Sequence, residues 1–113
     1  MDDCLFCKII KGEIPSTKIY ENEYVYAFAD IAPQAPFHAV IVPKVHITSA
    51  AEINDSNSIY VAKIYEAIAV IAKNENLEKG FRVVTNCGED GGQTVGHLHF
   101  HLLARRYLQW PPG

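Results

Sequence analysis

Residues 96–103, GHLHFHLL, carry three histidines that are spaced two apart and alternate with apolar side chains. Because successive side chains of a β-strand point to opposite faces, a strand here puts His97, His99 and His101 on one face, roughly 6.5 Å apart. The other face is typical of a side turned toward the core and consists of Leu98, Phe100 and Leu102. The pattern predicts a strand over residues 97–104 whose histidine face either meets water or lines a site.

Four more strands are predicted from the rest of the chain. Tyr24, Tyr26 and Phe28 lie two apart, so residues 17–30 are expected to form two strands around a turn at residues 21–23. The other two strands are predicted for FHAVIVPK, residues 37–44, and FRVVTN, residues 81–86.

Residues 55–76 predict one long helix. Asp55 or Ser56 can cap its start, and Gly80 suits the exit from it. Its apolar positions follow the i, i+3, i+4, i+7 spacing of a core-facing stripe: Val61, Ile64, Tyr65, Ile68, Ile71 and Ala72. The order of elements predicts an α+β fold with a mostly antiparallel five-stranded sheet and one long helix.

Composition narrows the class of protein. A chain of 113 residues, 49% hydrophobic and 20% charged, is expected to form a single domain over residues 1–113. A net charge of −3 argues against binding to nucleic acid or to an anionic membrane. The N-terminus does not resemble a signal peptide, and no apolar run has the length of a membrane span, so a cytoplasmic location is expected.

The segment NCGEDGGQTVGHLHFH, residues 86–101, joins a glycine-rich loop to the histidines. Backbone amides in such a loop can form an anion-binding concavity, and Gln93 and Thr94 add groups that hold phosphate oxygens. The glycines that permit this are Gly88, Gly91, Gly92 and Gly96. The alternative interpretation is a hairpin loop whose glycines serve only the turn geometry. Because the loop adjoins the three histidines, we favour the phosphate-binding interpretation.

The three histidines allow several chemistries. A neutral imidazole is a good nucleophile, so attack by His99 on phosphorus would give a phosphohistidine-type intermediate that water then hydrolyses. Alternatively, imidazoles two apart on a strand can bind a catalytic metal, or the face can be solvated and without function.

With these residues in view, the chain resembles the histidine-triad (HIT) proteins, and specifically their Hint branch. The similarity runs over nearly the whole length: CLFCKIIKGEIPS, FADIAPQAPFHAVIVPKVHI, NCGEDGGQTVGHLHFHLL and the closing QWPPG. It implies one HIT-like domain with a short N-terminal helix besides the long one. It also implies a purine nucleotide-binding phosphoramidase that releases a nucleoside monophosphate and an amine without a catalytic cofactor.

The same resemblance implies catalytic roles. The middle histidine, His99, would be the nucleophile that becomes transiently nucleotidylated, while His101 and His38 orient it and share its proton network. Gln93 and Thr94 would hold the α-phosphate and help to protonate the leaving amine. Thr94 stands where serine is usual in this branch, and it keeps the hydroxyl.

Substrate contacts are also implied by the resemblance. The ribose would contact Asp30, flanked by Phe28 and Ile31. The phosphate would face Asn86 and loop amides such as that of Gly92. The base would enter an apolar pocket formed by Leu5, Phe6 and Ile9. Members of the family typically form homodimers whose two sheets join, so Trp110 in the C-terminal tail would contact the substrate or leaving group in the partner's site.

Cys4 and Cys7 have the C-x-x-C spacing of a zinc knuckle, which needs two further ligands. His46 and His97 can supply them, as in relatives that carry a Cys-Cys-His-His zinc, and the site is expected to be structural. The alternative is a pair of reduced cysteines in a partly buried turn.

Three other functions stay open at this point. One is a nucleotide-binding or scaffold module with incidental hydrolysis, because binding and chemistry use the same loop. The second is a dinucleoside polyphosphate hydrolase, against which the WPPG ending and the short chain argue. The third is a metal-dependent hydrolase that uses the three histidines, which a chelator would inhibit.

Overall fold

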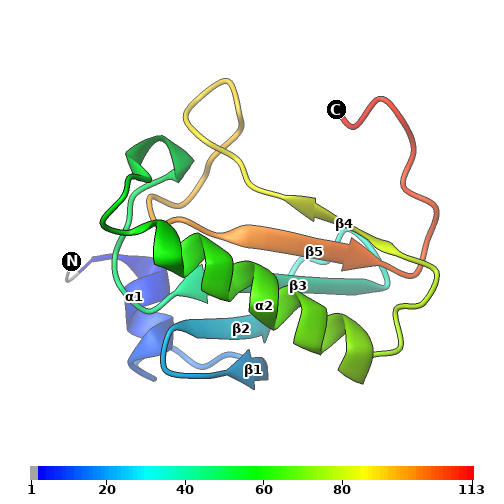
Figure 1. The fold of residues 1–113 in the computed structure, drawn as a ribbon, viewed down its shortest axis with the longest axis horizontal. Helices are drawn as coiled ribbons and strands as arrows, with labels where there is room; N and C mark the ends of the chain where they lie inside the picture. Colours follow the sequence, from blue (N-terminus) through cyan, green and yellow to red (C-terminus); the bar gives the residue numbers. More distant parts are fainter. Residues whose placement is uncertain (1–2) are drawn as a thin grey trace.

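The computed structural model describes residues 3–113. Five antiparallel strands form one sheet in the order β1-β2-β3-β5-β4, as Figure 1 shows. Their bounds are β1 Lys18–Glu21, β2 Val25–Ala29, β3 Phe37–Pro43, β4 Phe81–Val84 and β5 Phe100–Ala104. The helices are α1 Leu5–Ile10, the 3₁₀ turn η1 Ala50–Glu52 and α2 Ser58–Asn74. The expected α+β fold, with one long helix and a short N-terminal one, is therefore confirmed.

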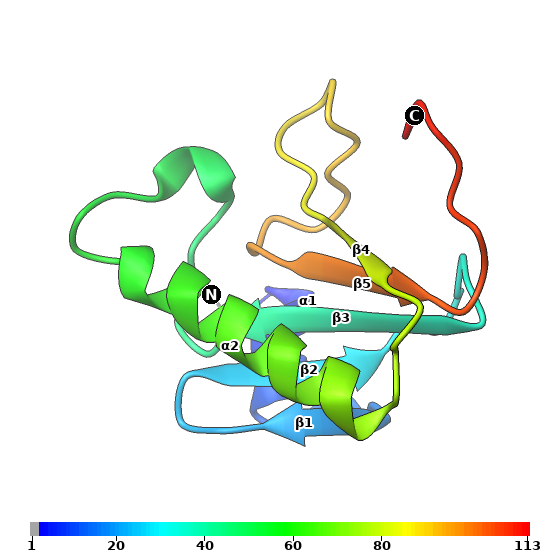
Figure 2. The same ribbon diagram turned by 45° about the vertical axis from the view of Figure 1, so that its right-hand side comes forward.

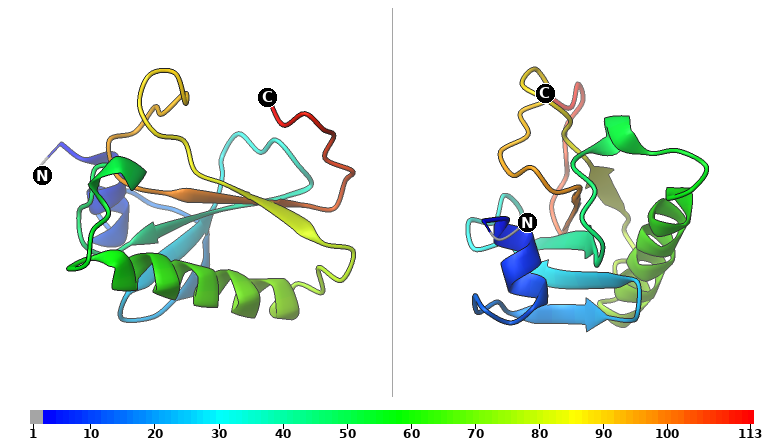
Figure 3. Two further views of the ribbon diagram at one scale, coloured as in Figure 1. Left: turned by 45° about the horizontal axis from the view of Figure 1, so that its top comes forward. Right: turned by 90° about the vertical axis from the view of Figure 1, so that its left-hand side faces the viewer.

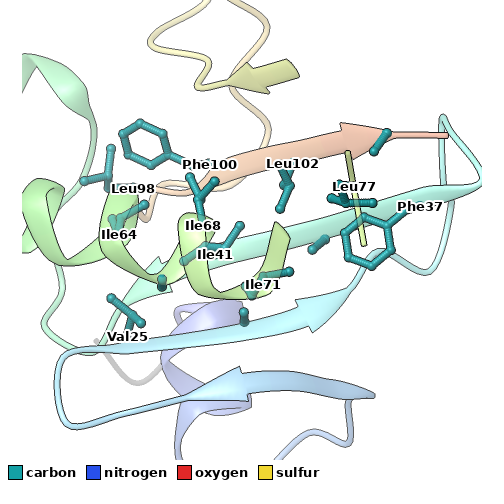
Figure 4. Close-up of a cluster of buried hydrophobic side chains, with 14 of the residues drawn as sticks. Val25, Phe37, Ile41, Ile64, Ile68, Ile71, Leu77, Leu98, Phe100 and Leu102 are labelled. Atoms are coloured by element: carbon teal, nitrogen blue, oxygen red, sulfur yellow. The ribbon is translucent and has the colours of Figure 1, made fainter. Parts of the chain in front are cut away.

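The sheet lies between the two α-helices (Figures 2 and 3). Alternate residues of the central strand β3 serve the two sides, which is why all seven of its residues are buried. Ala39 and Ile41 face α2 and belong to the larger core, drawn in Figure 4. Val40 and Val42 pack on the other side with Phe6 of α1. His38 has the same parity as these two valines and so belongs to the α1 side.

Helix α2 starts and packs differently from the prediction. Its N-cap is Asn57 rather than Asp55 or Ser56, and the Asn57 side chain makes no capping bond. Instead its carboxamide accepts from the Asn54 N–H and donates to the Glu52 carbonyl, so it organises the preceding turn.

The buried stripe of α2 is also narrower than predicted and consists of Ile64, Ala67, Ile68 and Ile71. Tyr65 is half exposed, because it lies at the border of this stripe. One edge of its ring contacts Phe100, with centroids 5.8 Å apart, while the rest meets solvent.

The last strand is shorter than the predicted span. β5 begins at Phe100, so His97 and His99 precede the ladder, and β4 ends at Val84 rather than at residue 86. The alternation nevertheless continues upstream, since Leu98 is buried in the α2-side core and donates its N–H to the Ile47 carbonyl. Within residues 3–113, no helix combines the length and the apolar character that crossing a bilayer requires.

Candidate functional site

Four of the five histidines gather on the α1 side of the sheet, and the fifth, His46, lies beside His97. His101 in β5 lies next to His38 in β3, with Nδ1 of His101 2.8 Å from Nε2 of His38. The rings of His99 and His101 meet edge to face at 5.1 Å between centroids. His97 turns away from this pair toward the two cysteines near the N-terminus.

The tautomer of His99 follows from its hydrogen bond. Its Nδ1 lies 2.7 Å from the carbonyl oxygen of His97. A carbonyl oxygen only accepts, so neutral His99 carries its proton on Nδ1 and a lone pair on Nε2. The ring is buried and packs against the edge of Phe6 with centroids 5.0 Å apart. The arrangement holds a nucleophilic nitrogen in one orientation.

His101 has the opposite tautomer, again because of its partners. The backbone N–H of Gln34 donates to Nδ1 of His38 at 3.0 Å, so neutral His38 keeps its proton on Nε2. That proton is donated to Nδ1 of His101, which leaves the His101 proton on Nε2. A carboxylate oxygen of Asp30 also lies 3.4 Å from Nε2 of His38. The chain of bonds ends in an N–H donor on His101.

Burial keeps these rings neutral. It is the largest cause that lowers the pKa of His101 to about 4, and the neighbouring His99 and His38 lower that pKa further. Burial also lowers the pKa of His38, against the Asp30 carboxylate, which raises it. Near neutral pH the hydrogen bond between His38 and His101 is therefore one between uncharged imidazoles.

Beside the histidines lies an apolar cluster that contains three of the residues expected to contact the base and ribose. Phe6, Ile9 and Phe28 are each buried there, and the Phe6 and Phe28 rings meet at 5.5 Å. Leu5 and Ile31 are exposed, Ile31 completely. Leu5 and Ile31 remain available only as rim contacts to a ligand.

The glycine-rich loop is held by two of the side chains assigned to the phosphate. Gln93 donates its carboxamide protons to the carbonyls of Thr48 and Val95, and its oxygen accepts the Gly88 N–H. Asn86 donates to the Gly91 carbonyl at 2.6 Å. In the protein without ligand both residues thus shape the loop.

Three positions in this loop require glycine. Gly88 and Gly92 adopt φ angles of 70° and 76°, which side chains rarely tolerate. A Cβ on Gly91 would collide with the backbone of Cys87. Thr94 is exposed, and its hydroxyl makes no hydrogen bond to any other residue between positions 3 and 113. The loop therefore presents a rigid backbone with one free hydroxyl.

Trp110 lies in the C-terminal tail and is 78% exposed. Arg82 holds this tail by donating to the carbonyls of Leu108 and Gln109. The tail and the glycine-rich loop rise on the same side of the molecule (Figure 2).

Cys4, Cys7, His46 and His97 form a separate cluster in which one ligand atom of each lies within 4.8 Å of the others. The distances from sulfur to Nδ1 are 3.4 Å for Cys4–His97, 3.4 Å for Cys7–His46 and 3.5 Å for Cys7–His97. Tetrahedral zinc with ordinary bond lengths separates sulfur and nitrogen ligands by about 3.5 Å. The four residues fit zinc.

The tautomer of His97 in this cluster suits a cation. His97 donates its Nε2 proton to the Pro43 carbonyl, so its Nδ1 offers a lone pair to the cluster, as a metal ligand must. Burial and the Cys4 thiol raise the pKa of Cys7 to about 11. Zinc would reverse that preference, because it binds the thiolate.

Three partners in the site have no signature in the sequence. The carbonyls of His97 and Pro43 and the N–H of Gln34 set the protonation of the histidines, and every residue but proline has both groups. Arg106, which donates to the Gln34 carbonyl, was also missed. A basic residue after a strand gives no indication of such a role.

Comparisons with known proteins agree with this arrangement. The HIT domain matches residues 11–108. A 14 kDa zinc-binding protein of Zea mays is 49% identical over 96% of this chain and 87% of its own. The adenylylsulfatase HINT1 of Arabidopsis thaliana is 40% identical over 96% of this chain and 76% of its own. A crystal structure of a HIT family hydrolase from Legionella pneumophila has a TM-score of 0.95 at 47% identity and covers 98% of this chain and 100% of that one. This chain belongs to the HIT family.

Proposed function

We propose that the protein is a nucleotide hydrolase that cleaves purine nucleoside 5′-phosphoramidates, including substrates like aminoacyl adenylates, to nucleoside monophosphate and amine. The observation that carries this proposal is the fixed lone pair on Nε2 of His99 beside a glycine-rich loop. Similarity to a HIT family hydrolase and to an adenylylsulfatase supports hydrolysis at a nucleotide phosphate.

The reaction proceeds in two displacements. Nε2 of His99 attacks the α-phosphorus, a phosphorus–nitrogen bond forms, and the bond to the amine breaks with its electron pair leaving on nitrogen. The leaving nitrogen takes a proton from solvent water, which the free hydroxyl of Thr94 is suited to relay. A second water then attacks phosphorus and gives up a proton to solvent. The phosphorus–nitrogen bond to His99 breaks, nucleoside monophosphate leaves, and Nε2 of His99 regains its lone pair.

Charge on phosphorus is stabilised from two sides. The Nε2–H of His101 donates to a phosphoryl oxygen, and His38 holds His101 in the required tautomer. Amides of the loop, including that of Gly92, donate to the other oxygens, while Gln93 and Asn86 keep the loop in shape.

The nucleoside lies over the apolar cluster. Phe6, Ile9 and Phe28 contact the base, with Leu5 and Ile31 at the rim. Asp30 binds the ribose hydroxyls with the lone pairs left after its bond to the Ala32 N–H.

Zinc in the Cys4, Cys7, His46 and His97 cluster would be structural. It would join α1 to the segments after β3 and before β5 and would take no part in the reaction. A maize relative is named a zinc-binding protein, which supports this assignment. Cysteine pairs that bind metal suit a reducing compartment, so we place the protein in the cytoplasm.

The decisive experiment is rapid-quench hydrolysis of adenosine 5′-phosphoramidate with intact-mass detection of adenylylated protein. Wild type should show a transient adenylyl adduct, and His99→Ala should show neither adduct nor turnover while still binding adenosine monophosphate. Cys87→Ser changes the same loop at a residue without a proposed role and should behave as wild type. Nucleotide binding without adduct or turnover in wild type would favour a binding module, and turnover by His99→Ala would refute the nucleophile. Preference for diadenosine polyphosphates would indicate the other hydrolase activity.

A further inference from the structure

Arg106 lies next to the loop that precedes β3, and the register of the sheet explains why. Strands β3 and β5 pair with Phe37 opposite Ala104, so the residues before β3 and those after β5 lie side by side at one end of the sheet (Figure 3). Arg105 adopts a left-handed backbone conformation with a φ of 72°, which turns the chain as it leaves β5. The next side chain, Arg106, then reaches residues 31–36.

The guanidinium of Arg106 donates two hydrogen bonds to a single backbone carbonyl, that of Gln34. Its Nε and Nη2 lie 3.0 Å and 2.9 Å from the oxygen of Gln34. Bonds from a charged, planar donor are stronger and more directional than neutral ones. In the described chain, the remaining hydrogen bonds of residues 31–36 stay between residues 30 and 38. Arg106 is therefore the anchor that ties this loop to a distant segment.

Gln34, whose carbonyl accepts from Arg106, also bonds His38 through its N–H. The Gln34 N–H donates to Nδ1 of His38 at 3.0 Å. The two residues before Gln34 offer no substitute, because Pro33 has no N–H and that of Ala32 is donated to Asp30. The Gln34 N–H at Nδ1 and the Asp30 carboxylate near Nε2 thus act together to keep the proton of neutral His38 on Nε2.

We propose that Arg106 is a positioning residue for the histidine network. By fixing Gln34 it keeps the His38 proton on Nε2, and through the 2.8 Å bond to His101 it keeps the His101 proton on Nε2 as well. This role rests on the proposed hydrolysis, in which the Nε2–H of His101 donates to the phosphoryl group.

Loss of the two hydrogen bonds from Arg106 to Gln34 changes which ring nitrogens of His38 and His101 are protonated, and it removes no group from the site. When the Gln34 N–H no longer points at His38, Nδ1 of His38 can take the proton and Nε2 becomes an acceptor. His101 must then carry its proton on Nδ1 to keep the bond between the rings, and its Nε2 no longer donates. The phosphoryl group loses a donor, while the base and ribose contacts are unchanged. The expected change is in kcat rather than KM.

The test compares Arg106→Gln with wild type in two measurements. Nitrogen chemical shifts of the histidine rings distinguish protonated from unprotonated nitrogens, and they should show protonated Nε2 on His38 and His101 in wild type. In Arg106→Gln, part of the population should shift the proton to Nδ1. Phosphoramidate turnover should show a kcat roughly 10-fold lower at a KM within about twofold.

Two further variants serve as controls. Arg106→Lys keeps a charged single donor and should give intermediate shifts and kcat, and it carries the same readout if Arg106→Gln does not fold. Arg105→Gln removes the neighbouring guanidinium, which bonds Glu75, and should leave ring shifts and kcat unchanged.

Wild-type ring shifts in folded Arg106→Gln would overturn the proposal, whatever its kcat, since any loss of activity would then be structural. The same shifts altered equally by Arg105→Gln would overturn it too. Because the shifts are read without substrate, they decide the role of Arg106 even if phosphoramidates are not cleaved. In that event the proposed function alone fails.

Discussion

His99 and His101 carry the same ring but present opposite functions at the same atom. Nδ1 of His99 donates to a carbonyl, so its Nε2 offers a lone pair, whereas Nδ1 of His101 accepts from His38, so its Nε2 offers a proton. The hydrogen-bond partners thus make an acceptor nitrogen of one histidine and a donor nitrogen of the other.

The lowered pKa of His101 predicts how stability depends on pH. Folded His101 has a pKa of about 4, against 6.5 for the ordinary side chain. Between these values the unfolded chain binds more protons, so the free energy of unfolding rises with pH across that window and levels off above 6.5. Urea unfolding at about pH 5 and about pH 7 measures the difference, which should be smaller in His101→Gln. An equal pH difference in both proteins would contradict the shift.

At the residue scale, the sequence predicts which side of the sheet each histidine side chain faces, but it does not predict the tautomer of each ring. The spacing of His97, His99 and His101 correctly places alternate side chains on opposite sides, even though β5 begins only at Phe100. Tautomers depend on backbone atoms of other segments, and no residue type in the sequence reports them.

Helix α1 has six residues, too few to be stable by itself, and both cysteines lie at its start. Cys4 caps it by accepting the Cys7 N–H on sulfur. Phe6, between them, contacts both His97 and His99. The helix depends on its attachment to the rest of the fold.

We therefore expect Cys7→Ser to lose bound zinc and to melt at least about 5 °C lower than the zinc-loaded wild type. Metal analysis should find one zinc per wild-type chain and none in the variant, and circular dichroism gives the melting temperatures. Cys87→Ser removes a cysteine outside the cluster and should keep both zinc and melting temperature. Zinc retained at full stoichiometry in Cys7→Ser would show that the ligand set is wrong.

Element types are predictable here because hydrophobic period is a local property. The stripe in α2, the aromatic residues two apart in β2 and the β-branched residues of β3 identify a helix and two strands directly. The predicted ends of the helices and strands are less accurate than their predicted types. The N-cap of helix α2 is Asn57, whose side chain bonds within the preceding turn, and Tyr65 is half exposed because it lies at the border of the buried stripe.

At the scale of the whole molecule, the sheet has two edges, β1 and β4. Phe81 at the start of β4 is 44% exposed, and Tyr107 and Trp110 in the adjoining tail are 84% and 78% exposed. Large apolar side chains at an open edge suit pairing with a second copy. We propose that two copies of the chain join at β4 to form a homodimer, which would carry Trp110 to the partner's site.

Sedimentation tests this proposal. Wild type should sediment as a species of twice 12.6 kDa, and Phe81→Glu should shift it toward the single chain. Ile59→Glu changes a similarly exposed side chain on α2 and should leave the mass unchanged. A wild-type protein that stays a single chain at high concentration would show that the edge is not an interface.

The main chain and the side chain of His97 contact different parts of the site. Its ring belongs to the cysteine cluster, while its carbonyl orients His99. Any amino acid supplies a carbonyl, so the reaction makes no demand on the side chain at this position. Replacing the His97 ring would therefore remove one ligand from the cysteine cluster and leave in place the carbonyl that orients His99.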